Sequence, residues 1–169
     1  WPSTLGAPAA GATWTLHHSA DASLAVADGA VSGGDDAVAL TPVSGGLPAD
    51  VAERFPALAG YTVLRAEGLP RADAAAILTE QVWVTQTSGG ELTAATGVQI
   101  PGVLDDLYAD GVADVDLGLV FDGAAAAATL WAPTAQDAVL LRTPAGAAAG
   151  TAPTEVAATR DDGSGVWTT

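Results

Sequence analysis

Three pairs of adjacent carboxylates are the residues of this sequence whose types come closest to acid–base chemistry. They are Asp35-Asp36, Asp105-Asp106 and Asp161-Asp162. Two carboxylates cleave a glycosidic bond when they face it from opposite sides, about 5–9 Å apart. Neighbouring side chains instead point about 100° apart in a helix and 180° apart in a strand. We therefore expect no catalytic residue in this chain and interpret the pairs as solvated turns.

A second cluster combines histidine, serine and aspartate. His17-His18 is followed by Ser19 and Asp21, which are the residue types of a nucleophile–base–acid triad. The alternation of polar and apolar residues at 13–17 predicts a strand, in which neighbours face opposite sides of the sheet. The two imidazoles are thus not expected to converge on one metal ion or one nucleophile.

The sequence also gives little indication of a loop that binds cations or phosphate. Residues 161–165, Asp-Asp-Gly-Ser-Gly, offer oxygen ligands for calcium, but they are more simply a turn whose glycines take positive φ. The clusters Ser32-Gly33-Gly34 and Ser44-Gly45-Gly46 lack the Lys-Ser/Thr ending and the strand-to-helix setting of a phosphate cradle. The chain has no Cys. We expect no metal and no cofactor.

Tryptophan is the commonest aromatic residue and suggests sugar stacking. Five Trp stand beside two Tyr and two Phe, and saccharide CH faces favour aromatic platforms. Trp83 lies in an alternating strand, where a large aromatic usually fills a β-sandwich. Trp131 and Trp167 belong to two motifs that, as described below, resemble the framework of a known module. Trp1 and Trp14 are therefore the candidates for binding carbohydrate, although Trp14 also lies in an alternating strand.

The composition limits the partners of the chain. Apolar residues make up 49% and charged residues 15%, as in packed globular proteins. The net charge of −15 repels phosphate backbones and anionic lipids, so neither nucleic acid nor a membrane surface is expected as a partner. The sequence opens on Trp1, lacks Met and has no basic-then-apolar leader, so we expect an internal piece of a longer product.

The elements that would position these residues are mainly short strands. Segments rich in Val, Leu, Thr and Trp recur between Gly, Pro, Asp and Ser, as in an all-β antiparallel sandwich of the immunoglobulin-like class. Segments 13–17 and 22–26 are expected to pair as a hairpin. Asp28-Gly29 is expected to form a turn, and Ser88-Gly89-Gly90 a hairpin loop between two later strands. The other expected strands cover 37–40, 62–65, 81–87, 92–95, 117–121, 129–131, 138–142 and 155–159.

Three short helices are expected to connect these strands. They cover 49–55, 72–78 and 103–108, and each follows a proline. Pieces of one or two turns cannot form a helical layer, so we exclude a parallel α/β sheet. An acidic stretch at 110–116 indicates a boundary. We place one domain at 1–111 and a partial second β-sandwich at 117–169.

Two motifs in the second segment resemble a known module. Residues 130–136, Leu-Trp-Ala-Pro-Thr-Ala-Gln, are similar to the opening of the family 48 carbohydrate-binding module of α-1,6-acting amylolytic enzymes. Residues 159–167, with Arg160, an acidic turn and Trp167, resemble a later part of that module. The sequence departs from the module where Thr129 and alanines replace the usual aromatic.

Two further motifs narrow the resemblance. Residues 54–61, Arg-Phe-Pro-Ala-Leu-Ala-Gly-Tyr, and residues 95–108 look like the N2-type domain of the pullulanase and limit dextrinase group of glycoside hydrolase family 13. In that family the catalytic Asp and Glu residues belong to a barrel far downstream, so none can be carried over to this chain.

The resemblance implies an accessory role. The chain would scaffold the downstream catalytic barrel of the same protein, and that barrel would hydrolyse α-1,6 linkages in pullulan, glycogen or limit dextrins. Contact with α-glucan and secretion to the outside of the cell are further expectations from the resemblance. Two alternatives stay open: an independent α-glucan-binding module and an immunoglobulin-like adhesion domain. The coding sequence after Thr169 would separate the adhesion domain from the other two.

Overall fold

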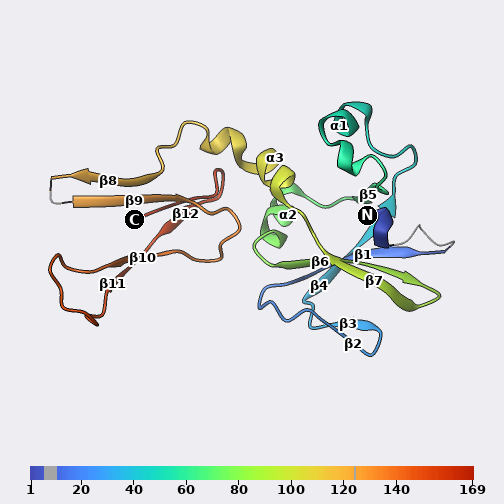
Figure 1. Ribbon diagram of the computed structural model, residues 1–169, viewed down its shortest axis with the longest axis horizontal. Helices are drawn as coiled ribbons and strands as arrows, with labels where there is room; N and C mark the ends of the chain where they lie inside the picture. The colour runs from blue at the N-terminus through green and yellow to red at the C-terminus, as the bar shows by residue number, and fades with distance from the viewer. Residues whose placement is uncertain (6–10, 124) are drawn as a thin grey trace. The chain divides into compact units, whose positions relative to one another are not determined.

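The computed structural model describes residues 1–5, 11–123 and 125–169, and these form two compact units (Figure 1). Unit 1 is Trp1–Val98 and unit 2 is Gln99–Thr169. Both units are built mostly from antiparallel strands, and the described residues include three short α-helices. The predicted β-rich class with short connecting helices is therefore confirmed.

Unit 1 is organised around one five-stranded antiparallel sheet in the order β5-β4-β1-β6-β7. The first strand, β1, lies at the centre of the sheet. It pairs with β4 on one side and with β6 on the other, and both of these strands lie well beyond it in the sequence. The strands are β1 (Thr13–Ser19), β4 (Asp36–Pro42), β5 (Leu64–Ala66), β6 (Gln81–Ser88) and β7 (Glu91–Gly97).

The two faces of this sheet carry different elements. Figure 1 shows α1 (Ala49–Arg54) and α2 (Arg71–Ile77) on one side and the hairpin of β2 (Ala25–Ala27) and β3 (Ala30–Ser32) on the other. Short 3-10 turns cover Ser3–Leu5 and Pro56–Leu58. The helices begin where prolines fix the entry backbone, as the sequence predicts.

Both predicted hairpin turns form. Asp28 and Gly29, with φ of 52° and 75°, connect β2 to β3, and Gly89 and Gly90, with φ of 63° and 88°, connect β6 to β7. Two successive residues with positive φ define the type I′ turn, whose twist matches that of paired strands.

The expected hairpin between 13–17 and 22–26 is wrong. β1 pairs with β4 and β6, while β2 pairs with β3. The chain leaves β1 through a turn in which Ala22 has φ of 57°, and the tight turn after β2 then selects the next segment as its partner.

Unit 2 contains a four-stranded and a two-stranded sheet. The larger has the order β12-β13-β9-β8, and the smaller pairs β10 with β11. The expected strands of this part form, and β12 and β13 complete the larger sheet. The strands are β8 (Gly118–Asp122), β9 (Ala125–Trp131), β10 (Val139–Arg142), β11 (Thr154–Ala157), β12 (Thr159–Asp161) and β13 (Val166–Thr168).

The third helix is longer than expected and belongs to unit 2. α3 covers Pro101–Val112 instead of 103–108, and it buries Leu107 and Tyr108. The helix passes so close to the β12–β13 turn that a Cβ on Gly111 would lie 2.7 Å from the carbonyl oxygen of Gly163. The two compact units divide between Val98 and Gln99, before α3, and the domain boundary after 111 stays a prediction.

Candidate functional site

A cavity of about 160 Å³ lies in unit 1 where the β2–β3 hairpin faces the sheet. Its sheet wall carries four polar side chains, and the two I′ turns bring backbone of Gly29 and Gly90 to its rim. Its lining includes Thr15, His17, Thr85 and Thr87 from β1 and β6, together with Val31 and Leu92.

The polar wall arises from the register of β1 and β6. Thr13 stands opposite Thr87 and Thr15 opposite Thr85, so these hydroxyls share one face of the sheet. The Thr13 and Thr87 hydroxyls lie 2.7 Å apart. Thr85 is 1% exposed, and its Oγ1 lies 3.0 Å from Nε2 of His17.

Burial shapes the chemistry of His17. Removal of the ring from water lowers the pKa of His17 below its ordinary value of 6.5. The imidazole is therefore neutral at neutral pH, with one nitrogen able to donate and the other to accept.

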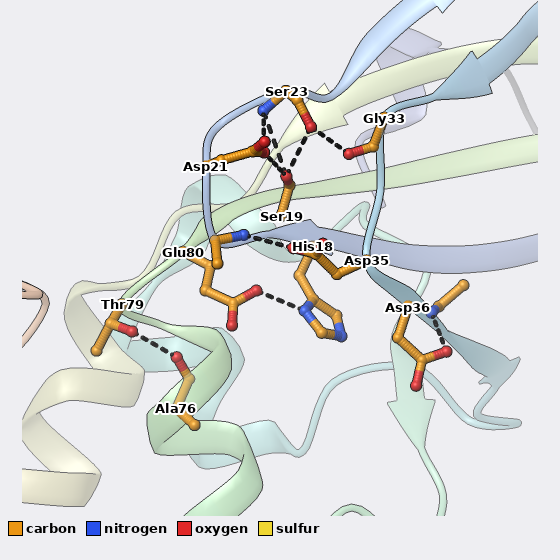
Figure 2. Close-up of polar contacts among 12 residues, drawn as sticks. His18, Ser19, Asp21, Ser23, Gly33, Asp35, Asp36, Ala76, Thr79 and Glu80 are labelled. Carbon is orange, nitrogen blue, oxygen red and sulfur yellow. Dashed lines mark hydrogen bonds and ion pairs between the residues drawn. The ribbon is translucent and has the colours of Figure 1, made fainter.

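His18 leaves the strand on the opposite face, as the sequence predicts. Its Nδ1 donates to Oε2 of Glu80 over 2.6 Å, which ties β1 to the segment between α2 and β6 (Figure 2). The hydroxyl of Ser19 donates to Oδ1 of Asp21 over 2.7 Å and not to either histidine. The triad residue types therefore do not form a triad.

The serines and Asp21 close the turn after β1. Asp21 also accepts from the backbone N–H of Ser23 at 3.1 Å, and the Ser23 hydroxyl donates to the carbonyl of Gly33 (Figure 2). Hydrogen bonds from Ser23 and Ser19 hold the pKa of Asp21 below its usual value. A Cβ on Gly33 would lie 2.0 Å from the carbonyl oxygen of Ser23, so this close approach requires glycine.

The two tryptophans predicted to bind sugar lie in different surroundings. Trp14 is 4% exposed and belongs to the core of unit 1. Trp1 is partly exposed, and its terminal ammonium donates to the carbonyl of Thr62 over 2.7 Å. Sugar binding at Trp1 and Trp14 stays a prediction, and only Trp1 retains accessible surface for it.

The acidic pairs lie in different kinds of secondary structure. Asp105 and Asp106 lie in α3 and Asp36 begins β4, so the expectation of turns is wrong for these residues. The pair 161–162 does lie in a turn, where Oδ1 of Asp161 accepts from Ser164 N at 2.8 Å and Ser164 Oγ at 2.7 Å. These bonds from Ser164 lower the pKa of Asp161. Across the described ranges, no group of three or more His, Asp or Glu is placed to hold a metal ion.

Arg160 connects α3 to the sheet of unit 2. Its Nη2 donates to Tyr108 Oη over 3.2 Å and to the carbonyl of Pro133 over 3.0 Å. Its Nη1 pairs with Asp162. The guanidinium also lies 6.0 Å from the centre of the Tyr108 ring. These contacts tie Arg160 to the acidic turn, to α3 and to the segment after β9.

The sequence reasoning missed the cavity. Its signal is the alternation of threonines in two strands, Thr13 and Thr15 in one and Thr85 and Thr87 in the other. The alternation places the hydroxyls on one face of each strand, but their juxtaposition depends on a pairing that spans about seventy residues.

Comparison with known families identifies the chain. The family described as the pullulanase N2 domain matches residues 1–106. The chain belongs to the pullulanase N2 domain family. The matched residues include the whole of unit 1 and the first half of α3.

Curated relatives support this assignment. The chain is 35% identical over 123 residues to "Pullulanase 1, chloroplastic" of Arabidopsis thaliana, which covers 72% of this chain and 12% of that protein. It is 32% identical over 142 residues to "Pullulanase" of Klebsiella pneumoniae, covering 83% of this chain and 12% of that protein.

Solved structures resemble the chain over nearly its full length. A Klebsiella pneumoniae pullulanase complexed with maltotriose matches 93% of this chain with a TM-score of 0.75 and 27% identity. The PulA protein of Klebsiella oxytoca matches all of it with a TM-score of 0.74 and 29% identity. The chain spans only 14% and 15% of these two structures, so in its relatives this region is a small part of a longer chain. No described helix is long and apolar enough to cross a membrane.

Proposed function

We propose that the chain is a non-catalytic accessory region of a pullulanase-like enzyme that hydrolyses α-1,6 linkages in pullulan, glycogen or limit dextrins. The observation that carries the proposal is the match of the N2 family to residues 1–106. The arrangement within each carboxylate pair supports it, since sequence neighbours point in different directions, whereas glycoside hydrolysis needs two carboxylates that face one bond.

In this proposal the second segment, 117–169, contributes strands to a family 48 carbohydrate-binding module. The support is the pair of motifs around Trp131 and Trp167, whose indole N–H groups donate to the carbonyls of Ser164 and Ala132, each over 2.9 Å. These reciprocal bonds make the two motifs one structural unit. An immunoglobulin-like sandwich, completed by further strands, is proposed for this segment.

The proposed role is to support the catalytic domain structurally. The accessory region packs beside the catalytic barrel of the same chain, stabilises it and extends its glucan-binding surface, where Trp1 offers a partly exposed ring. Secretion to the outside of the cell belongs to the same proposal. The adhesion-domain alternative has no comparable support, because the N2 family match relates the chain to enzymes.

The proposal is tested in the longer chain that it implies. Deletion of 1–106 is expected to leave measurable pullulan hydrolysis and to lower the temperature at which half the activity is lost. Circular dichroism establishes that the shortened enzyme is folded. A folded deletion variant with no hydrolysis at all would contradict the proposal, because an accessory region contributes no group to the chemical step.

A further inference from the structure

The cavity beneath the β2–β3 hairpin has the chemistry of a binding site for one neutral, hydroxyl-rich ring. We propose that it holds a single glucose unit of an α-glucan, separately from any stacking at Trp1. The choice of glucose rests on the proposed function, whereas the class of ligand follows from the lining residues.

The charges of the lining select a neutral ligand. Among the described residues that line the cavity there is no Asp, Glu, Lys or Arg, and His17 is the one titratable side chain. Because burial keeps this imidazole neutral at neutral pH, the cavity offers no ion pair to an anion or a cation. A charged ligand would lose hydration without compensation.

Unused hydrogen-bonding capacity lines the wall. Nε2 of His17 is engaged with Thr85, which leaves Nδ1 as either donor or acceptor according to the tautomer. In the part of the chain that the structure describes, neither this nitrogen nor the hydroxyl of Thr15 has a hydrogen-bond partner. A vicinal diol both donates and accepts, so it satisfies this pair in either tautomer.

An aromatic ring stands beside the polar wall. Trp83 is directly opposite His17 in the paired strands, so both side chains leave the same face of the sheet. Trp83 is partly exposed. Trp83 is not part of the described lining, so in this proposal its ring meets the CH face of a pyranose that extends from the cavity. Val31 and Leu92 provide apolar contacts within the cavity.

The size of the cavity limits the ligand to one ring. The volume of about 160 Å³ is about half the lower limit of a drug-sized pocket, roughly 300 Å³. One monosaccharide unit fits this volume, with the rest of the glucan chain outside. We therefore expect weak binding that contributes through repetition along a polymer.

The test is a titration of the intact chain with maltotriose, followed by backbone amide shifts in NMR. The amides of Thr15, His17, Thr85 and Gly90 are expected to shift together. Thr15→Val removes one cavity hydroxyl, keeps the β-branched shape and leaves the His17–Thr85 bond intact. It is expected to weaken maltotriose binding about fivefold to tenfold, as the loss of one hydrogen bond predicts.

The matched control is Thr41→Val. Thr41 lies in β4, outside the cavity, where its hydroxyl donates to the carbonyl of Arg65 at 3.3 Å. This variant is expected to bind maltotriose as the unchanged chain does. Trp83→Leu provides a second variant and is expected to weaken binding, while glucuronate is expected to bind less well than glucose.

Shifts confined to other residues, or equal affinities of Thr15→Val and Thr41→Val, would overturn the proposal. Tighter binding of glucuronate than of glucose would also overturn it. None of these results bears on the accessory role, which is tested by hydrolysis in the longer chain. Conversely, a maltotriose site at Thr15 would persist if that role proved wrong.

Discussion

The two units of this chain distribute apolar surface in opposite ways. Unit 1 has helices on one face of its sheet and a hairpin on the other, and Trp14, Leu24 and Ile77 are buried there. In unit 2 the buried apolar side chains belong to α3, which packs against the β12–β13 turn, and to β13, while other strands carry exposed apolar residues. The exposed residues there include Leu117, Leu119, Val120, Phe121, Leu130, Val139 and Leu141, each more than half exposed.

This difference indicates where stability resides. Burial of apolar area is the main driving force of folding, at about 25 cal/mol per Å². Unit 1 obtains it from both faces of one sheet, but unit 2 obtains it mainly from the cluster of Leu107, Tyr108, Val166 and Trp167. The cluster in unit 2 should therefore be more sensitive to a single substitution than the exposed strands are.

The largest expected effect is that of Trp167→Ala. Trp167 is 6% exposed, and its Nε1 donates to the carbonyl of Ala132 over 2.9 Å. Its loss is expected to cost about 3–5 kcal/mol of unfolding free energy. Hydrogen exchange should show lost protection in β9 and β13 and unchanged protection in β1 and β6.

Leu130→Ala serves as the matched control for this substitution. Leu130 stands opposite Trp167 in the sheet but is 54% exposed, so its replacement should change stability by about 0.5 kcal/mol or less. Equal losses from the two substitutions would contradict the concentration of unit 2's core at the α3–β13 end.

A pair of glycines in α3 gives the next largest effect. Gly111→Ala places a Cβ 2.7 Å from the carbonyl oxygen of Gly163, and overpacking of this kind costs about 1–3 kcal/mol. Gly102→Ala meets no atom within 4 Å and should gain up to about 1 kcal/mol of helix propensity. Urea unfolding of both variants distinguishes the two signs. If both variants were stabilised, α3 would not be packed on the β12–β13 turn.

Unit 1 is expected to respond to pH through His17. Its pKa in the fold is lowered by burial from the ordinary 6.5, so the unfolded chain takes up the proton first. Stability should therefore be independent of this group above pH 6.5 and should fall as the pH drops from there toward the lowered pKa. His17→Gln should reduce the slope of the melting temperature against pH in this window. An unchanged slope would show that His17 is not desolvated.

The smallest expected effect on stability is that of Phe121→Ser. Phe121 is 72% exposed in β8, so its removal should change the free energy of unfolding by about 0.5 kcal/mol or less. Self-association should decrease, because an exposed apolar strand at a sheet edge favours intermolecular pairing. Sedimentation measures this directly. A large loss of stability would mean that the Phe121 side chain is packed against another part of the chain.

Local signals in the sequence predicted much of the fold. Asp28-Gly29 and Gly89-Gly90 require positive φ, and Pro48 and Pro70 begin helices, so the turns and the helix starts were readable. The partners of β1 were not, because pairing with β6 depends on contacts about seventy residues away. The extension of α3 was missed because glycine is unfavourable inside a helix, so Gly111 indicated that the helix had ended. In the structure Gly111 lies within α3 and permits a close backbone contact with Gly163.

For the candidate site, the sequence predicted only which residues do not act together. Strand alternation correctly separated His17 from His18, whereas the expected lack of catalytic carboxylates stays a prediction. The cavity could not be predicted, because Thr15 and Thr85 meet across paired strands and the hairpin that faces them returns from a different part of the chain.

The proposed accessory role predicts that this chain by itself does not hydrolyse pullulan. The decisive measurement is release of reducing sugar from pullulan by the purified chain at high protein concentration, beside a matched preparation without it. We expect no release above that of the matched preparation. Reproducible formation of maltotriose, abolished by removing the chain from the mixture, would contradict the accessory role.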